Sequence, residues 1–462
     1  MITRIEAYNY RCFPQLSVDV GRYHVLAGAN GAGKTTLLDI PVLLGDLLRA
    51  NRAAGAFLGR REEGALAPRA SRLAELIHNN QGDRIAFAVE AALPAEVHAA
   101  LAAPGREAIP GPVPTRLRYE LRLDVGPRTL DVADEYLFLF AATEDQVRFG
   151  ERTDSAGTEK PRPVAPTAGY FSQGRPISGT NLHSQEWRPV LVREGRAPAR
   201  FCYEVPVSAT DLPPMKVPQN QLALGSAPAD ESLFPALRWF AELLRAGVLY
   251  YEPDWDLLRR PAPPGDTTQL RSDARNTPWL ALALQQQQEQ QPDQPRRFTR
   301  WVEHVQTALP QITDIRVVER EEDHHAYFAV CYQGGYEVTS SGLSDGTLRV
   351  LALTLPPYLA YLDSGDNGPV LPTVLVAEEP ENGIHPQAIE TVVTSLSSIY
   401  PAQVWLSTHS PIVLAQTEAA EVLATRLRNG TVEVIPGDEH PALVNWPGTL
   451  DLGTIFAAGV LS

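Results

Sequence analysis

Short runs of apolar residues recur along the 462-residue chain and predict its buried strands. Residues 23–27, 373–377 and 404–406 are almost wholly hydrophobic over the length of one strand. Such runs, without alternation, are typical of strands that are covered on both faces, as in a parallel sheet. Residues 1–6 open the chain as another strand, followed by a turn at 8–13. We therefore expect an α/β protein built on a mostly parallel sheet.

A second pattern, alternation of apolar and polar residues, covers residues 84–93 and 115–130. Because successive side chains of a strand point to opposite faces, this period of two predicts antiparallel strands with one face in water. Residues 315–319 and 326–330 predict a further strand pair. The acidic and histidine-rich run 321–325 lies between them, and on an extended chain its side chains would converge poorly on one ion. We expect a hydrated hairpin tip there rather than a metal site.

The third pattern is helical spacing, which starts at Asp230 as the expected N-cap and continues through residue 244. Residues 279–284 and 298–309 predict two more helices, separated by a glutamine-rich tract that we expect to be a solvated loop, residues 285–291. Residues 141–184 are rich in Gly, Pro, Ser and Thr. This composition predicts a long irregular excursion.

Composition narrows the class of protein. The formal net charge of −15 argues against a surface coated with phosphate-seeking lysines, although it leaves room for a local basic groove. No apolar run reaches the roughly eighteen residues of a membrane span, and the N-terminus lacks the pattern of a signal peptide. Cys12, Cys202 and Cys331 form no C-x-x-C pair. We expect reduced thiols, a cytoplasmic protein and no membrane partner.

The stretch from Gly28 to Thr36, GANGAGKTT, matches the pattern G-x-x-x-x-G-K-[ST] at every fixed position. A loop that wraps phosphates must expose backbone N–H groups, and glycines remove the side chains that would obstruct this approach. Lys34 supplies a charge for the β and γ phosphates, and Thr35 supplies a hydroxyl for Mg²⁺. The preceding strand and following helix are the required setting. We expect a nucleoside triphosphate with Mg²⁺, bound by Gly28, Ala29, Asn30, Gly31, Ala32, Gly33, Lys34, Thr35 and Thr36.

Carboxylates directly follow the predicted strand 373–377. Adjacent carboxylates at the end of a buried strand are costly unless a cation or a catalytic role stabilises them, and open α/β sheets bind ligands at that edge. We expect Glu378 to lie near Mg²⁺ and Glu379 to orient and deprotonate an attacking water. The strand at 404–406 brings His409 to the same edge, where it is placed to sense or bind the γ phosphate.

A second helix N-terminus suited to phosphate is predicted at residues 344–346. Ser344 is placed to cap the helix, Asp345 follows it, and Gly346 leaves the first N–H groups open. Alone, this feature would indicate an ordinary capped helix. Its position between the phosphate loop and the acidic strand end gives it more weight.

The order of these motifs resembles that of the ABC-type ATPases, and within them the RecF/SMC-like and OLD-like predicted AAA-type ATPases of bacteria. The resemblance covers roughly residues 1–45 and 335–415. It implies a P-loop ABC-type head, with a mostly parallel sheet, an antiparallel β-subdomain and a largely helical insertion between phosphate loop and signature. By this resemblance, residues 344–347 are the signature that reaches the partner subunit's ATP, Glu378 is the metal-site acid, Glu379 the catalytic carboxylate, His409 the switch histidine, and residues 381–385 the dimer-contact loop.

The sequence departs from the family pattern in two places. The signature is Leu-Ser-Asp-Gly-Thr rather than Leu-Ser-Gly-Gly-Gln, and the metal-site acid is a glutamate rather than an aspartate. Both forms are familiar in the OLD-like branch, and they leave the rate of ATP hydrolysis open. Gln81 and Gln173 are the candidates for the family's Q-loop glutamine. The segment after His409 shows no acidic cluster like that of the OLD nucleases, so a nuclease would be a separate protein.

The resemblance implies three parts and a set of partners. Residues 1–200 form an N-terminal lobe with Walker A and the antiparallel β-subdomain, 201–330 a mainly helical insertion, and 331–462 a C-terminal lobe with signature, Walker B and switch histidine. We expect an ATP-assembled homodimer or higher even oligomer that hydrolyses ATP and gates a separate effector, such as a nuclease, or a DNA process in repair or anti-phage defence.

Two alternatives stay open. The first is that the chain is a RecF-like ATPase that clamps DNA directly, and the acidic charge balance argues against this interpretation. The second is that the chain is the nucleotide-binding subunit of a transporter, and the long insertion argues against this interpretation. A GTPase is less favoured still, because the Asn-Lys-x-Asp motif that reads the guanine base is absent.

Overall fold

In the computed structural model, the strand before the glycine-rich loop lies inside a six-stranded sheet of order β16-β15-β3-β14-β13-β9. Five of its strands run parallel, and β16 pairs antiparallel with β15 at one edge. The structure describes residues 1–59, 68–102, 112–141, 187–205, 212–265, 268–291, 293, 295–360, 362, 370–428, 430–443 and 451–459. The strands are β3 (Tyr23–Gly28), β9 (Val248–Tyr250), β13 (Val374–Glu378), β14 (Gln403–Thr408), β15 (Val422–Arg428) and β16 (Thr431–Pro436).

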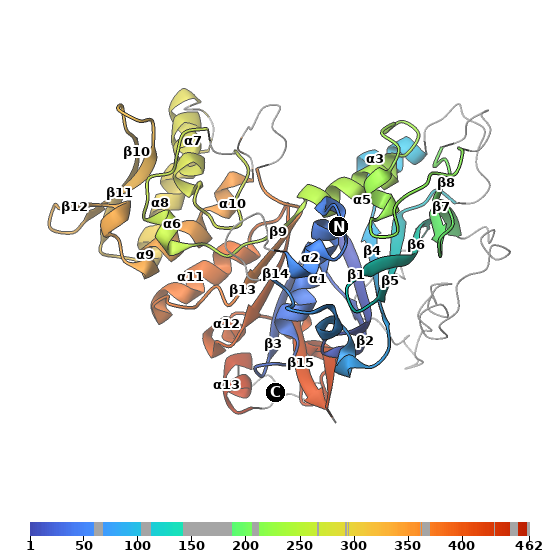
Figure 1. Cartoon of the computed structure of the whole chain (residues 1–462). Coiled ribbons are helices and arrows are strands. Elements are labelled where there is room, and N and C mark those ends of the chain that lie inside the picture. Colours follow the sequence, from blue (N-terminus) through green and yellow to red (C-terminus); the bar gives the residue numbers. More distant parts are fainter. Residues whose placement is uncertain are drawn as a thin grey trace.

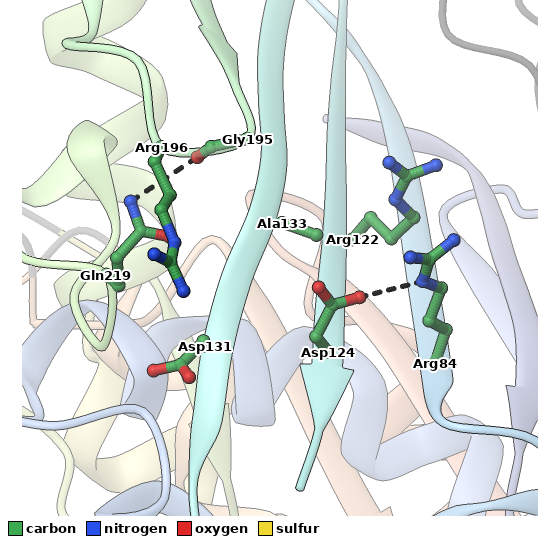
Figure 2. Close-up of a pocket in the computed structure, with 8 residues that line it drawn as sticks. All are labelled: Arg84, Arg122, Asp124, Asp131, Ala133, Gly195, Arg196 and Gln219. Carbon is green, nitrogen blue, oxygen red and sulfur yellow. Dashed lines mark hydrogen bonds and ion pairs between the residues drawn. The ribbon is translucent and has the colours of Figure 1, made fainter.

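A second, antiparallel sheet has the order β2-β1-β4-β5-β6-β7-β8. On its face opposite the protein core, the turn after β7 and strands β4 to β6 enclose a small pocket (Figure 2). A third sheet of three strands, β10-β11-β12, lies apart from both (Figure 1). These strands are β1 (Ile2–Tyr10), β2 (Phe13–Asp19), β4 (Arg84–Ala92), β5 (Arg116–Val125), β6 (Leu130–Phe140), β7 (Trp187–Glu194), β8 (Arg200–Phe201), β10 (Ile312–Glu319), β11 (Ala326–Tyr332) and β12 (Glu337–Thr339).

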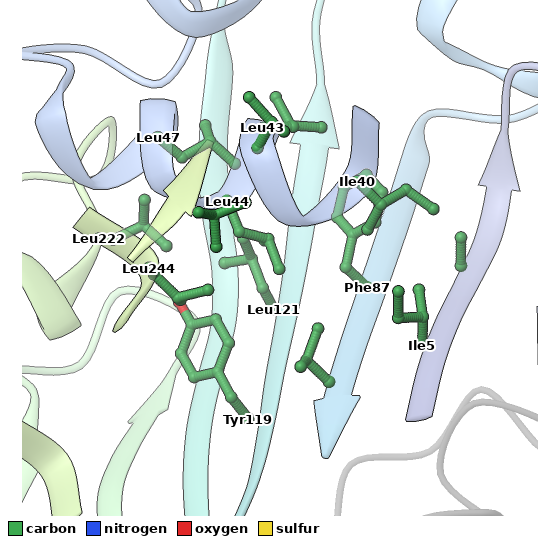
Figure 3. Packing of buried hydrophobic residues seen from close by; sticks show 14 of the residues in the cluster. Ile5, Ile40, Leu43, Leu44, Leu47, Phe87, Tyr119, Leu121, Leu222 and Leu244 are labelled. Atoms are coloured by element: carbon green, nitrogen blue, oxygen red, sulfur yellow. The ribbon is translucent and has the colours of Figure 1, made fainter. Parts of the chain in front are cut away.

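Helix α1 (Lys34–Arg49) joins the two large sheets, and Figure 3 shows it lying over strands of the antiparallel sheet. It is hydrophobic nearly all round, which is typical of a helix buried between layers. Its residues Leu43 and Leu47 belong to the same buried cluster as Phe87 of the antiparallel sheet and Val376 of the parallel sheet. The loop at the start of α1 is therefore fixed from both sides.

The other face of the parallel sheet packs on a second group of helices, whereas α2, α3 and α5 share the cluster around α1. Tyr23, Val25 and Ala27 of β3 share a second buried cluster with residues of α7, α8, α9 and α11. The helices are α2 (Gly55–Leu58), α3 (Ala95–Leu101), α5 (Pro235–Ala246), α6 (Trp255–Leu258), α7 (Thr277–Gln290), α8 (Arg297–Ala308), α9 (Asp345–Thr354), α10 (Pro356–Leu359), α11 (Pro386–Ser397), α12 (Pro411–Ala415) and α13 (Leu452–Ala457). No helix in the described part of the chain is long and apolar enough to cross a bilayer.

The predicted fold class, a mostly parallel sheet with helices and an antiparallel β-subdomain, is confirmed. The predicted three-part division stays a prediction, with strand β9 of the central sheet falling inside the range expected to be mainly helical. The irregular excursion expected at 141–184, including Gln173, lies outside the described residues except for Ala141. The run 321–325 lies in the turn between β10 and β11.

Two local predictions are wrong. Asp230 does not cap a helix: α5 begins at Pro235, and Asp230 accepts a hydrogen bond from the Ser232 N–H instead. Proline suits a first helical turn, where its missing N–H costs nothing. The glutamine tract is not a loop but the second half of α7. Glutamine is a good helix former, and Gln288 also accepts from the backbone N–H of Thr299 in the first turn of α8.

Candidate functional site

The glycine-rich loop connects β3 to α1, and packing requires two of its glycines, Gly28 and Gly33. A Cβ atom on Gly28 would lie 2.1 Å from the carbonyl oxygen of Thr425 in β15. Gly33 caps α1 with a φ of 84°, and a Cβ there would lie 2.9 Å from the Sγ of Cys12. Between these two closely packed glycines, residues 29–31 are exposed. The loop therefore presents its backbone to solvent directly at a helix N-terminus, as a phosphate site requires.

Lys34 is held beneath this loop. Its side chain is buried, at 5 % exposure, and Nζ donates hydrogen bonds to the carbonyl oxygens of Gly28 at 2.9 Å and Ala29 at 3.0 Å. Burial lowers the pKa of this ammonium, and the nearby carboxylates of Glu379 and Glu378 oppose that shift. The charge of Lys34 thus sits between the loop and the acidic end of β13.

Glu378 is fixed at both carboxylate oxygens. It is the last residue of β13, opposite Ser407 of β14 in the parallel ladder. The Thr35 hydroxyl donates to Oε1, and the Tyr250 hydroxyl donates to Oε2 at 2.5 Å. Three segments that are distant in sequence, α1, β9 and β13, therefore meet at one carboxylate.

Glu379 lies in a strained backbone conformation. Its φ is 42°, a region that residues other than glycine rarely adopt. Its N–H donates to the Ser407 carbonyl oxygen at 3.0 Å, and its Oε2 accepts from Asn382 Nδ2 at 2.6 Å. Its Oε1 lies 3.4 Å from His409 Nε2. The sharp turn directs the carboxylate out of the strand and toward the histidine.

Glu381 holds the backbone of His409 by hydrogen bonds. Its side chain is 7 % exposed, and Oε1 accepts from the Thr408 hydroxyl at 2.5 Å and from the His409 N–H at 3.2 Å. Burial raises the pKa of this carboxyl group. The acidic turn after β13 and the end of β14 are thus joined by hydrogen bonds on both sides of the Glu379–His409 pair.

The predicted signature residues lie at the start of α9. Ser344 is the N-cap, as predicted, and its Oγ accepts from the Thr347 N–H at 3.1 Å. Asp345 forms an ion pair with Arg259 at 2.5 Å, and a Cβ on Gly346 would lie 3.2 Å from the Gly383 carbonyl oxygen. Ser344 and Asp345 are exposed. The contacts found for this end of α9 in the described part of the chain are therefore not with the glycine-rich loop.

The predicted site residues thus fall into two groups. Lys34, Thr35, Glu378, Glu379 and His409 converge at one edge of the parallel sheet. In the group at 344–346, Ser344 and Asp345 are exposed at the start of α9 and Gly346 is half-buried. The roles predicted for these residues stay predictions.

The converging group fits a Mg²⁺–nucleoside triphosphate by its chemistry. Hydroxyl and carboxylate oxygens, the donors of Thr35 and Glu378, are the ligands that Mg²⁺ prefers. The exposed glycine-rich backbone and the Lys34 ammonium suit phosphate oxygens. Candidate ligands for the metal are Thr35 and Glu378, and the phosphates would lie against residues 28–36.

Sequence reasoning missed Tyr250. Only the order of strands in the sheet, which places β9 beside β13, brings its hydroxyl to Glu378. The run Val-Leu-Tyr-Tyr indicates a strand but nothing about its neighbour. Asn382 was included in the expected dimer-contact loop, but its bond to Glu379 within the same chain was not foreseen.

The pocket on the antiparallel sheet is a separate feature of about 290 Å³ (Figure 2). It contains three arginines, of which Arg84 pairs with Asp124 at 2.9 Å and Arg122 pairs with Asp134. Asp131 also lines it. Since acidic partners offset two of the three arginines, the pocket is not a strongly basic surface of the kind that attracts nucleic acid.

Comparison with known proteins gives one family match. Residues 24–415 match the family model described as "AAA domain, putative AbiEii toxin, Type IV TA system". No curated protein matches this chain. The matched range runs from β3 through α12 and includes every residue of the converging group.

Among solved structures, the head domain of Smc bound to the C-winged helix domain of ScpA is 12 % identical, with 94 % of this chain and 97 % of that chain covered and a TM-score of 0.46. An Smc head domain with an extended coiled coil, bound to the C-terminal domain of ScpA from Pyrococcus furiosus, is 12 % identical, with 94 % and 95 % covered and a TM-score of 0.45. The SMC head domain from Thermotoga maritima is 10 % identical, with 94 % and 98 % covered and a TM-score of 0.39.

Proposed function

The chain belongs to the family described as "AAA domain, putative AbiEii toxin, Type IV TA system", and from this membership we propose that it binds ATP with Mg²⁺ and hydrolyses it. The observation that carries the proposal is the convergence of Lys34 and Thr35 with Glu378 and Glu379 at one sheet edge. A charge for phosphate, two oxygen ligands for a metal and a second carboxylate are the parts that phosphoryl transfer to water needs.

Each residue has a distinct task in this proposal. Bound Mg²⁺ would neutralise charge on the β and γ phosphate oxygens. Lys34 binds the same phosphates as a point charge, and the backbone of residues 28–33 surrounds them. Glu379 orients the attacking water and accepts its proton, held in place by Asn382 at one oxygen and facing His409 at the other. His409 contacts the γ phosphate.

We further propose that two copies close around ATP. Ser344 and Asp345 are exposed at the N-terminus of a ten-residue helix, where N–H groups and the helix dipole favour an anion. Supplied by one subunit to the nucleotide of the other, this end of α9 would make ATP a bridge between them. ATP binding then favours the dimer and hydrolysis favours its separation, because the nucleotide contacts differ between the two states.

The ATP cycle is proposed to gate a separate effector protein, in anti-phage defence or DNA repair. The family description names a toxin of a toxin–antitoxin system, which supports a function shared with a partner protein. A cytoplasmic setting is supported by three cysteines that form no disulfide. The ion-paired pocket gives no support to the alternative of direct DNA clamping.

The test compares Glu379→Gln with Glu390→Gln, the same change at an exposed position of α11. Loss of a positioned general base costs about 10²- to 10⁴-fold in rate. We therefore expect Glu379→Gln to keep its affinity for ATP while phosphate release falls at least about a hundredfold, and Glu390→Gln to match the natural protein. Turnover at the natural rate in Glu379→Gln would place the catalytic carboxylate elsewhere. Failure of the natural protein to bind ATP would refute the proposed function altogether.

A further inference from the structure

A short segment, residues 248–259, connects the acidic end of β13 to helix α9. It consists of strand β9, a brief connection and helix α6. We propose that Tyr250 in this segment is a positioning residue for the carboxylate of Glu378, and that the segment transmits the state of that site to α9. This inference rests on the proposed function, because it concerns the same Mg²⁺–ATP site.

The first step is the geometry at Glu378. Tyr250 is 7 % exposed, and its hydroxyl donates to Glu378 Oε2 at 2.5 Å. The opposite oxygen, Oε1, accepts from Thr35, itself a candidate metal ligand. Tyr250 therefore sets the orientation of the carboxylate while leaving the oxygen beside Thr35 to face the metal position. Partners of this kind, one shell beyond the ligands, fix ligand orientation and tune metal affinity.

The second step is the way β9 holds Tyr250. The strand pairs in parallel with β13, where Tyr250 lies opposite Val376, and the next N–H, of Tyr251, donates to the Val376 carbonyl oxygen at 2.7 Å. Movement of β9 along β13 would break these backbone bonds. The tyrosine hydroxyl and the carboxylate are thus fixed by one ladder.

The third step is that neighbouring residues of β9 point to opposite faces of the parallel sheet. Successive residues of a strand point to opposite faces. Tyr250 belongs to the buried cluster around α1, whereas Tyr251 belongs to the cluster on the other face of the sheet. The Tyr251 hydroxyl donates to the carbonyl oxygen of Ala352, in α9, at 2.8 Å. Neighbouring residues of one strand therefore contact the metal-site acid and the signature helix.

The fourth step is the contact of α6 and the residue after it with the start of α9. The guanidinium of Arg349 lies 3.7 Å from the centre of the Trp255 ring, a cation–π contact. Arg259 donates to the Leu343 carbonyl oxygen and pairs with Asp345, each at 2.5 Å. These contacts fix the exposed end of α9, which carries Ser344. Because the ladder holds β9 to β13, a displacement of the Glu378 end of β13 would carry β9 with it and would consequently move the residues proposed to reach the second subunit.

The experiment uses the full chain and three single variants. Tyr250→Phe removes the hydroxyl and keeps the ring. Tyr23→Phe is the matched control, since it removes a buried tyrosine hydroxyl that has no hydrogen-bond partner among the described residues. Arg259→Gln breaks the far end of the segment. The Mg²⁺ concentration for half-maximal binding of a fluorescent ATP analogue is measured, together with hydrogen exchange of residues 345–354 with and without Mg²⁺–ATP.

We expect Tyr250→Phe to need about 10- to 100-fold more Mg²⁺, which is the usual effect of removing an outer-shell partner. The affinity of Tyr250→Phe for the nucleotide without metal should stay unchanged. The nucleotide affinity of Tyr23→Phe without metal should stay unchanged as well. Arg259→Gln should keep the natural Mg²⁺ requirement. It should lose the slowing of hydrogen exchange in α9 that we expect Mg²⁺–ATP to cause in the natural protein. Natural Mg²⁺ dependence in Tyr250→Phe would overturn the positioning role. Undiminished protection of α9 in Arg259→Gln would overturn the transmission. A natural protein that binds no Mg²⁺–ATP would refute the proposed function, and this inference with it.

Discussion

At the scale of single residues, the site depends on groups whose positions are fixed by burial. Lys34 shows this clearly, because its ammonium is buried and bonded to two carbonyl oxygens of its own loop. A lysine that is already in place loses little conformational freedom when a phosphate approaches. Its contribution to binding should therefore be close to the full strength of a charge-assisted hydrogen bond.

For this reason we expect Lys34→Ala to lose ATP affinity by at least about a hundredfold. A hydrogen bond to a charged group contributes about 1.5–3 kcal/mol, and the ammonium can reach more than one phosphate oxygen. Isothermal titration calorimetry with Mg²⁺–ATP measures the loss. The control is Lys216→Ala, at an exposed position. Unchanged affinity in Lys34→Ala would show that the loop does not hold the phosphates.

The residues of the glycine-rich loop could be predicted from sequence because the motif is local: loop, strand and helix lie within one short stretch. Tyr250 could not, because its partner Glu378 is 128 residues away and becomes its neighbour only through the order of strands in the sheet. The strained backbone conformation of Glu379 could not be predicted from the sequence either. It follows from hydrogen bonds to β14 and to Asn382 rather than from residue type.

At the scale of elements, helix ends show how tertiary contacts replace local signals. The start of α5 is capped from a distance: Glu204 accepts from the N–H groups of Ala236 at 2.6 Å and Leu237 at 2.7 Å. The local candidate, Asp230, lies too far before Pro235 to do this. Capping rules identify the residue type that a helix end needs, but a side chain from another segment can supply it.

The capping by Glu204 has a consequence for stability against pH. Burial raises the pKa of this carboxyl from 4.5 to about 7. Between these values the folded protein holds a proton that the unfolded chain has released, so the free energy of unfolding falls as pH rises through this window. The full change is about 3 kcal/mol for a shift of this size.

Urea unfolding of the natural protein and of Glu204→Gln at pH 5 and pH 8 tests this prediction. The natural protein should lose up to about 3 kcal/mol more than the variant between the two pH values, since glutamine does not titrate. Glu231→Gln, an exposed glutamate shortly before α5, is the control and should follow the natural protein. Equal pH dependence in all three proteins would contradict the raised pKa.

At the scale of the whole molecule, two sheets share one helix, and the candidate site lies where that helix begins (Figure 1). The periodicity of the sequence was sufficient to predict both kinds of sheet, because parallel and antiparallel strands differ in how apolar residues are spaced. It gave no order of strands, since that order depends on long-range pairing. The start of α9 is exposed in the single chain. In the proposed mechanism it contacts ATP bound by another subunit, so one chain alone does not provide its ligand.

A second copy of the chain is the proposed source of that partner, and its presence should depend on ATP. In Glu379→Gln, which is expected to bind ATP without hydrolysing it, Mg²⁺–ATP should convert monomers to dimers, measured as a doubling of mass by light scattering after gel filtration. Adding Ser344→Arg should prevent this, because a bulky cation replaces the exposed cap that would face the partner's nucleotide. Loss of the cap costs only about 1 kcal/mol, so the chain should stay folded. Ser341→Arg, also exposed but before the cap, should still dimerise. If Glu379→Gln remains monomeric with Mg²⁺–ATP, or if Ser344→Arg dimerises equally well, α9 does not close the site of a second subunit.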